Sequence, residues 1–172
     1  VIAEHAINNA IKNGTRIFYT TPLKALSNQK YYDFGEKYGQ ENVGLLTGDT
    51  SINRNAKIVI MTTEVFRNML YGTNFGSVTD NMKDVKYVVL DEVHYMNDEQ
   101  RGTVWEESII YCPTNVQIIA LSATVANAQE LTDWINTVHS KTELVDTDFR
   151  PVPLRFFYFD SSQPTKLLPL LT

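Results

Sequence analysis

The hydrophobic residues of this chain follow two kinds of pattern that alternate along it. Runs of consecutive apolar, β-favouring residues, such as Tyr87 to Leu90, are typical of strands buried on both faces. Elsewhere apolar residues recur at helical spacing, as in Leu131, Trp134, Ile135 and Val138. Strands are predicted at residues 16–19, 43–46, 57–61, 87–90, 116–121 and 143–145, with helices between most of them. This alternation predicts an α/β fold with a mostly parallel sheet and flanking helices.

Prolines and polar residues mark the places where the alternation stops. Residues 72–83 are polar and contain glycine, which predicts a surface loop, and residues 98–102 predict a turn. The segment 150–154 contains two prolines and breaks regular structure, and residues 154–159 are predicted to be extended. Residues 161–172 contain two more prolines and no period, so we expect a linker or tail there.

Size and composition indicate one globular domain with a sizeable core, since 43% of the 172 residues are hydrophobic. The net charge of −5 predicts that any contact with nucleic acid is local or shared with another domain, because bulk electrostatic binding needs a basic protein. Cys112 is the single cysteine and has no partner for an internal disulfide, so we expect a reducing compartment. We expect no membrane span, because no apolar run approaches about 20 residues. We expect no secretory signal, because no cleavable signal segment is visible at the start.

Two carboxylates directly follow the apolar run at residues 87–90. Burying a carboxylate is costly, so we expect Asp91 and Glu92 just past the carboxyl end of a strand, where open parallel sheets bind ligands. In nucleotide hydrolysis one such acid holds magnesium and the next polarises the attacking water. The alternative is that Asp91 and Glu92 simply form a charged turn after the strand. His5, His94 and His139 show no metal-ligand spacing, which argues against a metal hydrolase.

Polar groups also follow the other predicted strands. Thr21 and Pro22 predict the N-cap and first position of a helix, whose free amides and Lys24 either hold a phosphate or simply begin an ordinary helix. Strand ends elsewhere carry Thr47-Gly48-Asp49, Thr62-Thr63-Glu64 with Arg67 one turn later, and Ser122-Ala123-Thr124. Because the carboxyl ends of parallel strands share one edge of a sheet, we expect these groups along one rim.

These residues resemble the first RecA-like domain of superfamily 2 helicases, specifically the superkiller-type DExH-box RNA helicases, over almost the whole chain. Asp91-Glu92-Val93-His94 is similar to motif II and Ser122-Ala123-Thr124 to motif III. Residues 21–31, 46–49 and 61–67 resemble motifs Ia, Ib and Ic, and residues 101–107 and 150–154 resemble features of the subgroup. Residues 111–113 and 122–134 are most similar to the cyanobacterial and plastid branch.

The resemblance implies a RecA-like P-loop three-layer sandwich at residues 1–150 and, at 151–172, the start of a connection to a second RecA-like domain. It implies an ATP-dependent RNA helicase that uses ATP and magnesium. Asp91 would hold magnesium through water and Glu92 would activate the attacking water. The residues that would couple hydrolysis to movement are His94, Ser122 and Thr124. The RNA backbone would lie along Pro22, Lys24, Ala25, Gly48, Asp49, Thr63, Glu64 and Arg67.

The sequence departs from the family in one respect. A glycine-rich phosphate-binding loop ending in Gly-Lys-Thr is expected immediately before Val1, and the chain does not contain it. We therefore expect a fragment that folds without turning over ATP. The expected partners are RNA and the second RecA-like domain, in the bacterial cytoplasm or the plastid stroma. The alternatives are a DNA-directed superfamily 2 translocase and a non-hydrolysing RNA-binding scaffold.

Overall fold

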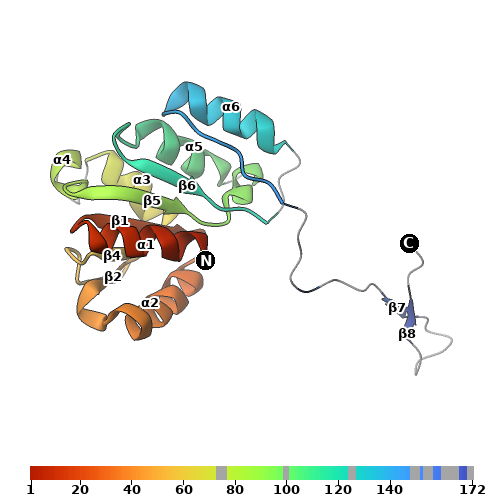
Figure 1. Ribbon diagram of the computed structural model, residues 1–172, viewed down its shortest axis with the longest axis horizontal. Helices are drawn as coiled ribbons and strands as arrows, with labels where there is room; N and C mark the ends of the chain where they lie inside the picture. The colour runs from red at the N-terminus through yellow and green to blue at the C-terminus, as the bar shows by residue number, and fades with distance from the viewer. Residues whose placement is uncertain are drawn as a thin grey trace.

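The computed structural model describes residues 1–72, 77–98, 101–123, 127–147, 152, 157–159 and 167–169. Strands and helices alternate as far as the end of α6 (Figure 1). The helices are α1 (Ile2–Lys12), α2 (Lys24–Tyr38), α3 (Thr63–Leu70), α4 (Val78–Asn81), α5 (Gly102–Tyr111) and α6 (Ala128–Val138), with short 3-10 helices η1 (Gln40–Asn42) and η2 (Val93–Asn97). The strands are β1 (Arg16–Thr21), β2 (Val43–Leu46), β3 (Ser51–Ile52), β4 (Ile58–Thr62), β5 (Val85–Leu90), β6 (Gln117–Ala120), β7 (Phe157–Phe159) and β8 (Leu167–Pro169).

Strands β1 to β6 form one sheet in the order β3-β2-β4-β1-β5-β6. Every neighbouring pair is parallel except β2 and β3, which are antiparallel. Thr20 of β1 lies opposite Met61 of β4 on one side and Leu90 of β5 on the other. The carboxyl ends of these three strands are therefore level, and the predicted mostly parallel α/β fold is confirmed.

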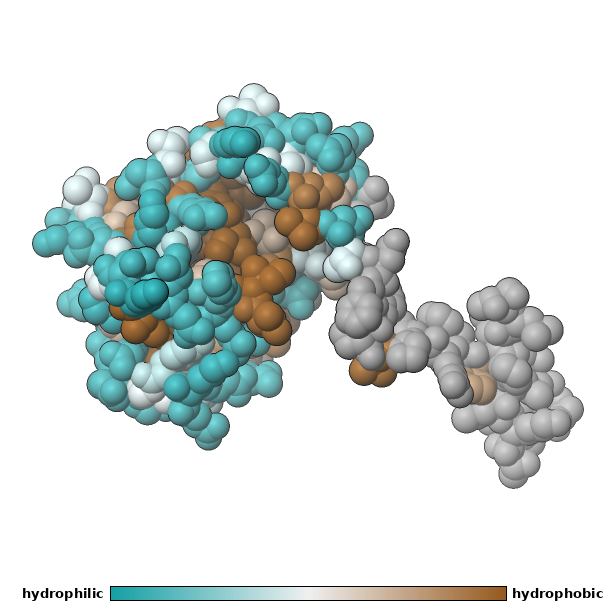
Figure 2. Space-filling model, in the orientation of Figure 1, coloured by the Kyte–Doolittle hydropathy of each residue, from teal (hydrophilic) through white to brown (hydrophobic). Residues whose placement is uncertain are grey.

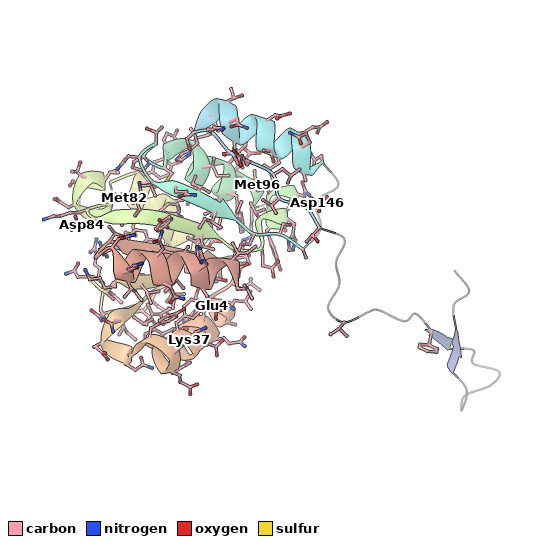
Figure 3. The ribbon with its side chains drawn as sticks, viewed as in Figure 1. Glu4, Lys37, Met82, Asp84, Met96 and Asp146 are labelled. Atoms are coloured by element: carbon pink, nitrogen blue, oxygen red, sulfur yellow. The ribbon has the colours of Figure 1, made fainter. Side chains whose placement is uncertain are left out.

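Two hydrophobic cores cover the two faces of the sheet. In β1, Ile17 and Tyr19 belong to the core that includes α1 and α2, whereas Phe18 belongs to the core that includes α3, α5 and α6. Figure 1 shows the two helix layers with the strands between them. Glu4 of α1 and Lys37 of α2 point toward each other (Figure 3), and their Oε1 and Nζ atoms are 2.6 Å apart.

The central strand is buried and the outer strand is not. Val88, Val89 and Leu90 of β5 are completely buried, which confirms the interpretation of this apolar run. The residues of β6, at the end of the sheet, are exposed or half-buried. Figure 2 shows apolar side chains at the surface over β6 and the first turn of α1, where Val1 and Ile2 are exposed.

The predicted cap of α2 is wrong. Thr21 is the last residue of β1, where it lies opposite Thr62 of β4, and its buried hydroxyl is 2.7 Å from Ser27 Oγ. The helix instead begins at Lys24, after Leu23, without a side-chain cap. Strand pairing outweighs the local capping preference at this position. The hydroxyl-rich start of α3 is confirmed, because Thr62 Oγ1 accepts a hydrogen bond from the amide of the residue three positions later.

Three other predictions need correction. Residues 143–145 are not a strand, and Val145 is 86% exposed, so the local alternation has no described strand to pair with. The predicted loop at 72–83 contains the short helix α4, which Ser77 caps by accepting from the amide of Asp80. The predicted tail at 161–172 contains β8, which pairs with β7. In the described part of the chain, no helix is long and apolar enough to cross a membrane.

Candidate active site at the carboxyl edge of the sheet

The acidic pair lies directly after β5 and is held by the strands on both sides. The amide of Asp91 donates to Thr20 O of the β1 strand (3.1 Å), and the amide of Val93 donates to Leu121 O just after β6 (2.8 Å). Glu92 has a left-handed backbone with φ of 54°, which turns the chain from β5 into η2. Such a conformation is uncommon for a residue other than glycine and is often found at functional sites. Both acidic residues are half-buried.

Tyr19 fixes the carboxylate of Asp91. The Tyr19 hydroxyl donates to Oδ2 at 2.6 Å, and the amide of Glu92 donates to Oδ1 at 3.0 Å. Burial, followed by the hydrogen bond to Asp91, raises the pKa of the Tyr19 phenol well above its usual range, so the phenol keeps its proton and remains a donor. The sequence pattern assigns Tyr19 no role, because a tyrosine in a buried strand is ordinary. The one feature of the sequence that could have indicated a role for Tyr19 is its position near the end of a strand.

His94 lies between the acidic pair and the end of β6. Its Nδ1 atom is 3.3 Å from Glu92 Oε2 and 3.5 Å from Ser122 Oγ. Two of the three predicted coupling residues, His94 and Ser122, are therefore close to each other, and His94 reaches Glu92. The described polar contact of Ser122 is with this histidine rather than with a carboxylate. Thr124, the third predicted coupling residue, lies outside the described residues.

A cavity of about 320 Å³ opens beside Tyr19, where the first turn of α1 meets α2. Lys30 reaches it from α2, with Nζ 5.9 Å from the ring centroids of both Tyr19 and Phe34. The cavity also borders Leu121, the residue whose carbonyl holds the segment after Asp91. Glu4 of α1 also lines this cavity, so Lys30 shares it with a carboxylate.

The chemistry of the acidic pair fits a magnesium ion that is also bound by the phosphates of a substrate. Magnesium is usually held by one or two carboxylates together with water and substrate phosphates. Among the described residues no group of three or more histidine, cysteine or acidic side chains is placed to bind a metal. Asp91, whose carboxylate is oriented by Tyr19 and by the amide of Glu92, is the residue that could hold a magnesium ion through water.

Four of the predicted RNA positions lie exposed at the other end of the rim. Lys24 of α2 forms a salt bridge with Asp49, whose Oδ1 also accepts from Thr47 Oγ1 at 2.9 Å. The hydrogen bond from Lys24, and then that from Thr47, lowers the pKa of the Asp49 carboxyl. Ala25 and Gly48 are exposed beside this pair. Lys24 and Asp49 come from connections that follow different strands, as the rim prediction requires.

Two other predicted RNA positions are buried. Thr63 is completely buried, and its Oγ1 donates to Thr21 O at 3.2 Å, which ties the start of α3 to the end of β1. Pro22 is buried in the connection between β1 and α2. Thr63 and Pro22 are therefore packed beneath the surface of the rim, and their side chains are not exposed to solvent.

Arg67 has a partner within the domain. Its Nη1 is 3.4 Å from Glu107 Oε2 of α5, and its guanidinium lies 5.9 Å from the centroid of the Tyr71 ring. The predicted position on the polar side of α3 is correct, but the charge is shared with an acidic residue of the neighbouring helix.

Glu64 pairs with Arg101, which begins the 101–107 segment that resembles the subgroup but has no predicted role of its own. The Nη2 atom of Arg101 contacts Glu64 Oε1 and also donates to Pro22 O at 2.8 Å. Arg101 lies 37 residues from Glu64 and 79 from Pro22 along the chain, so only the tertiary fold reveals these contacts.

Comparison with known sequences gives a consistent picture. Residues 1–131 match the DEAD/DEAH box helicase family. The chloroplastic DExH-box ATP-dependent RNA helicase DExH15 of Arabidopsis thaliana is 56% identical over 172 residues, which are 99% of this chain and 14% of that protein. The antiviral helicase SKI2 of Saccharomyces cerevisiae is 50% identical over 155 residues (90% of this chain, 12% of that protein). The superkiller complex protein 2 of Mus musculus is 48% identical over 165 residues (95% and 13%).

Two solved structures share the fold. The Mycobacterium smegmatis helicase Lhr bound to ssDNA and AMP-PNP has a TM-score of 0.53 and 26% identity, over 69% of this chain and 18% of that chain. The DUF1998 helicase MrfA has a TM-score of 0.58 and 23% identity, over 78% of this chain and 23% of that chain. Both are helicases, and the likeness confirms the RecA-like arrangement of a mostly parallel sheet between helix layers.

Proposed function

We propose, from the premise that this chain belongs to the DEAD/DEAH box helicase family, that it is the first motor domain of an ATP-dependent RNA helicase of the superkiller type. The chain spans about 12–14% of the length of the curated relatives named above, so the proposal concerns the longer protein of which such a domain is part. The observation that carries it is the placement of Asp91 and Glu92 on the same rim as Lys24 and Asp49.

On the nucleotide side of the rim, each acidic residue has a separate task. Asp91 would hold magnesium through water, because Tyr19 and the amide of Glu92 fix the orientation of its carboxylate. Magnesium, when bound, supplies charge neutralisation to the triphosphate of ATP. Glu92 would accept the proton of the attacking water, and its neighbour His94 connects this carboxylate to Ser122 at the end of β6.

On the RNA side, the exposed residues Lys24, Ala25, Gly48 and Asp49 would contact the sugar-phosphate backbone. Asp49 can accept a hydrogen bond from a 2′-hydroxyl, which DNA lacks, and this favours RNA as the substrate. Pro22, Thr63, Glu64 and Arg67 would shape the same path from partly or fully buried positions. Contacts of this kind carry little sequence preference.

The proposal includes the remainder of the protein. Residues 1–150 would form the motor domain, and residues 151–172 would begin the connection to a second RecA-like domain. His94, Ser122 and Thr124 would face that domain and relay hydrolysis to it. The name of the chloroplastic relative supports the plastid as the compartment of the protein, with the bacterial cytoplasm as the alternative.

The experiment that tests this function compares the ATPase rate of the full-length protein with single-stranded RNA, with single-stranded DNA of the same sequence, and without nucleic acid. We expect RNA to stimulate the rate most. Equal or greater stimulation by DNA would favour a DNA-directed translocase, for which the structure of Lhr with ssDNA is a precedent. ATP hydrolysis that is undetectable in every arm would favour an RNA-binding scaffold.

A further inference from the structure

We propose that Arg101 is a positioning residue that holds the Pro22 and Glu64 segments together at the rim and thereby sets the affinity for RNA. This inference rests on the proposed function, since it takes the RNA to lie along these two segments. Arg101 itself is not proposed to touch RNA.

The two segments leave the sheet in different directions, and Arg101 adds a link beyond the hydrogen bond from Thr63 Oγ1 to Thr21 O. β1 and β4 are neighbours in the sheet, but α2 packs in the core on one face of the sheet, whereas α3 packs in the core on the other. The connection with Pro22 and the start of α3 with Glu64 therefore diverge. The guanidinium of Arg101 spans this divergence, with Nη2 bonded to Pro22 O at 2.8 Å and to Glu64 Oε1.

Arg101 is anchored to the segment that carries the acidic pair. Its amide donates to Asp98 Oδ1 at 3.0 Å, and the amide of Gly102 donates to Asp98 O at 2.8 Å. Gly102 lies so close to η2 that a Cβ there would be 2.2 Å from Met96 O. The position of Arg101 is thus set by η2, which begins directly after Glu92. One side chain consequently joins the segment after Asp91 and Glu92 to two parts of the predicted RNA path.

Both contacts of the Arg101 side chain are made by the single atom Nη2. Lysine would keep the charge on a flexible stem but would lose the planar guanidinium that carries this atom. The side chains of Arg101 and Glu64 are 37% and 32% exposed, so solvent screens the ion pair and its stabilising energy is small. The contact therefore acts mainly by fixing positions.

The test uses the full-length protein with the substitutions Arg101→Ala, Arg101→Lys and Glu64→Gln. The ATPase rate is measured against the concentration of a single-stranded RNA, and binding of the same fluorescein-labelled RNA is followed by anisotropy. For Arg101→Ala we expect the RNA concentration for half-maximal stimulation to rise about tenfold while kcat at saturating RNA changes less than about twofold. For Arg101→Lys the RNA concentration for half-maximal stimulation should rise about threefold, because lysine keeps the charge but not the shape of the side chain.

A double-mutant cycle shows whether Arg101 acts through Glu64. Since the two side chains form one contact, combining Arg101→Ala with Glu64→Gln should weaken RNA binding by less than the product of the two single effects. If the effects multiply fully, Arg101 does not act through this pair and the proposal is overturned.

Arg16 provides a matched control at the opposite end of β1. Its guanidinium also bridges backbone carbonyls, of Ala56 at 3.1 Å and Arg54 at 2.8 Å, and it lies away from the rim. Arg16→Ala should lower the melting temperature and leave the half-saturating RNA concentration at the wild-type value. Equal shifts in Arg16→Ala and Arg101→Ala, or no shift in the Arg101 and Glu64 variants, would overturn the role of Arg101. A wild-type protein that RNA does not stimulate would overturn the proposed function itself. If Arg101→Ala fails to fold, Arg101→Lys and Glu64→Gln decide the question.

Discussion

Tyr19 and Asp91 are 72 residues apart in the sequence, and a single hydrogen bond joins them at the rim. A carboxylate binds a metal ion well only if it is held in one orientation. In metal sites, a hydrogen-bond partner that does not touch the metal commonly supplies that orientation. Tyr19 is such a partner by geometry, since its hydroxyl is fixed in β1 and donates directly to Asp91.

Replacing Tyr19 by phenylalanine removes this donor and leaves the ring in place. We expect the magnesium concentration for half-maximal ATPase activity of the full-length protein to rise about tenfold, in line with the loss of an outer-shell partner elsewhere. Tyr38→Phe is the control, because the Tyr38 hydroxyl is buried without a hydrogen-bond partner among the described residues. If the magnesium concentration for half-maximal activity is the same in Tyr19→Phe, Tyr38→Phe and the wild type, Tyr19 does not position Asp91.

Cys112 is a buried thiol, and burial raises the pKa of the Cys112 side chain to about 12 from its ordinary 9.0. Because the thiol ionises more readily in the unfolded chain, its contribution to stability is complete below about pH 9 and is lost as the pH rises toward about 12. The free energy of unfolding should therefore fall less steeply over this range in Cys112→Ala than in the wild type. Parallel pH profiles for the two proteins would contradict the stated burial effect.

At the scale of elements, the sequence predicts what burial dictates. The apolar run at residues 87–90 and the apolar face of α3 are correct because both must face a core. The start of α2 could not be predicted, because Thr21 and Pro22 satisfy local capping rules while strand pairing with β4 keeps Thr21 in β1. The absent strand at 143–145 has the same kind of cause, since a three-residue pattern carries no information about a pairing partner.

The candidate site divides in a similar way. Asp91 and Glu92 were predictable at the strand end, because a buried carboxylate without a partner is costly. Tyr19 and Arg101 were not, because their roles arise from contacts across 72 and 79 residues of chain. Local patterns carry the chemistry of the rim, while the contacts that orient this chemistry depend on the register of strands far apart in sequence.

The packing of η2 against α5 depends on Gly102. An added Cβ would lie 2.2 Å from Met96 O, and backbone cannot yield cheaply. Gly102→Ala should lower the free energy of unfolding of the domain by about 1–3 kcal/mol, the usual cost of overpacking. Gly48→Ala is the control for stability, because a Cβ there would meet nothing within 4 Å. A melting temperature for Gly102→Ala equal to that of Gly48→Ala would show that η2 and α5 can separate freely.

At the scale of the whole molecule, the proposed function divides one edge of the sheet into a nucleotide half and an RNA half. The nucleotide half lies after β5 and β6, and the RNA half follows β1, β2 and β4. The two halves are joined within the sheet by the contacts of Asp91 with Thr20 and Tyr19 of β1, and outside the sheet by η2 and its anchor at Arg101. Measurements of ATP hydrolysis test the nucleotide half.

The 172-residue chain contains no Gly-Lys-Thr or Gly-Lys-Ser sequence, which in related NTPases supplies the phosphate cradle and a lysine. We therefore expect the chain on its own to fold cooperatively, because it has two well-formed cores, but to hydrolyse ATP no faster than a buffer blank. The full-length protein, assayed at the same concentration, should turn over ATP. Equal rates in the two proteins would show that the described rim is sufficient for hydrolysis without that loop.

The role of the acidic pair is tested most directly with Glu92→Gln in the full-length protein. ATP binding and RNA-stimulated ATP hydrolysis are measured separately. Glu36→Gln serves as the control, since Glu36 is exposed on α2. We predict that Glu92→Gln binds ATP and RNA as the wild type does while its hydrolysis rate falls at least about a hundredfold, the usual loss on removing a general base. Hydrolysis at the wild-type rate in Glu92→Gln would contradict the assignment of the acidic pair at the end of β5 as the catalytic centre.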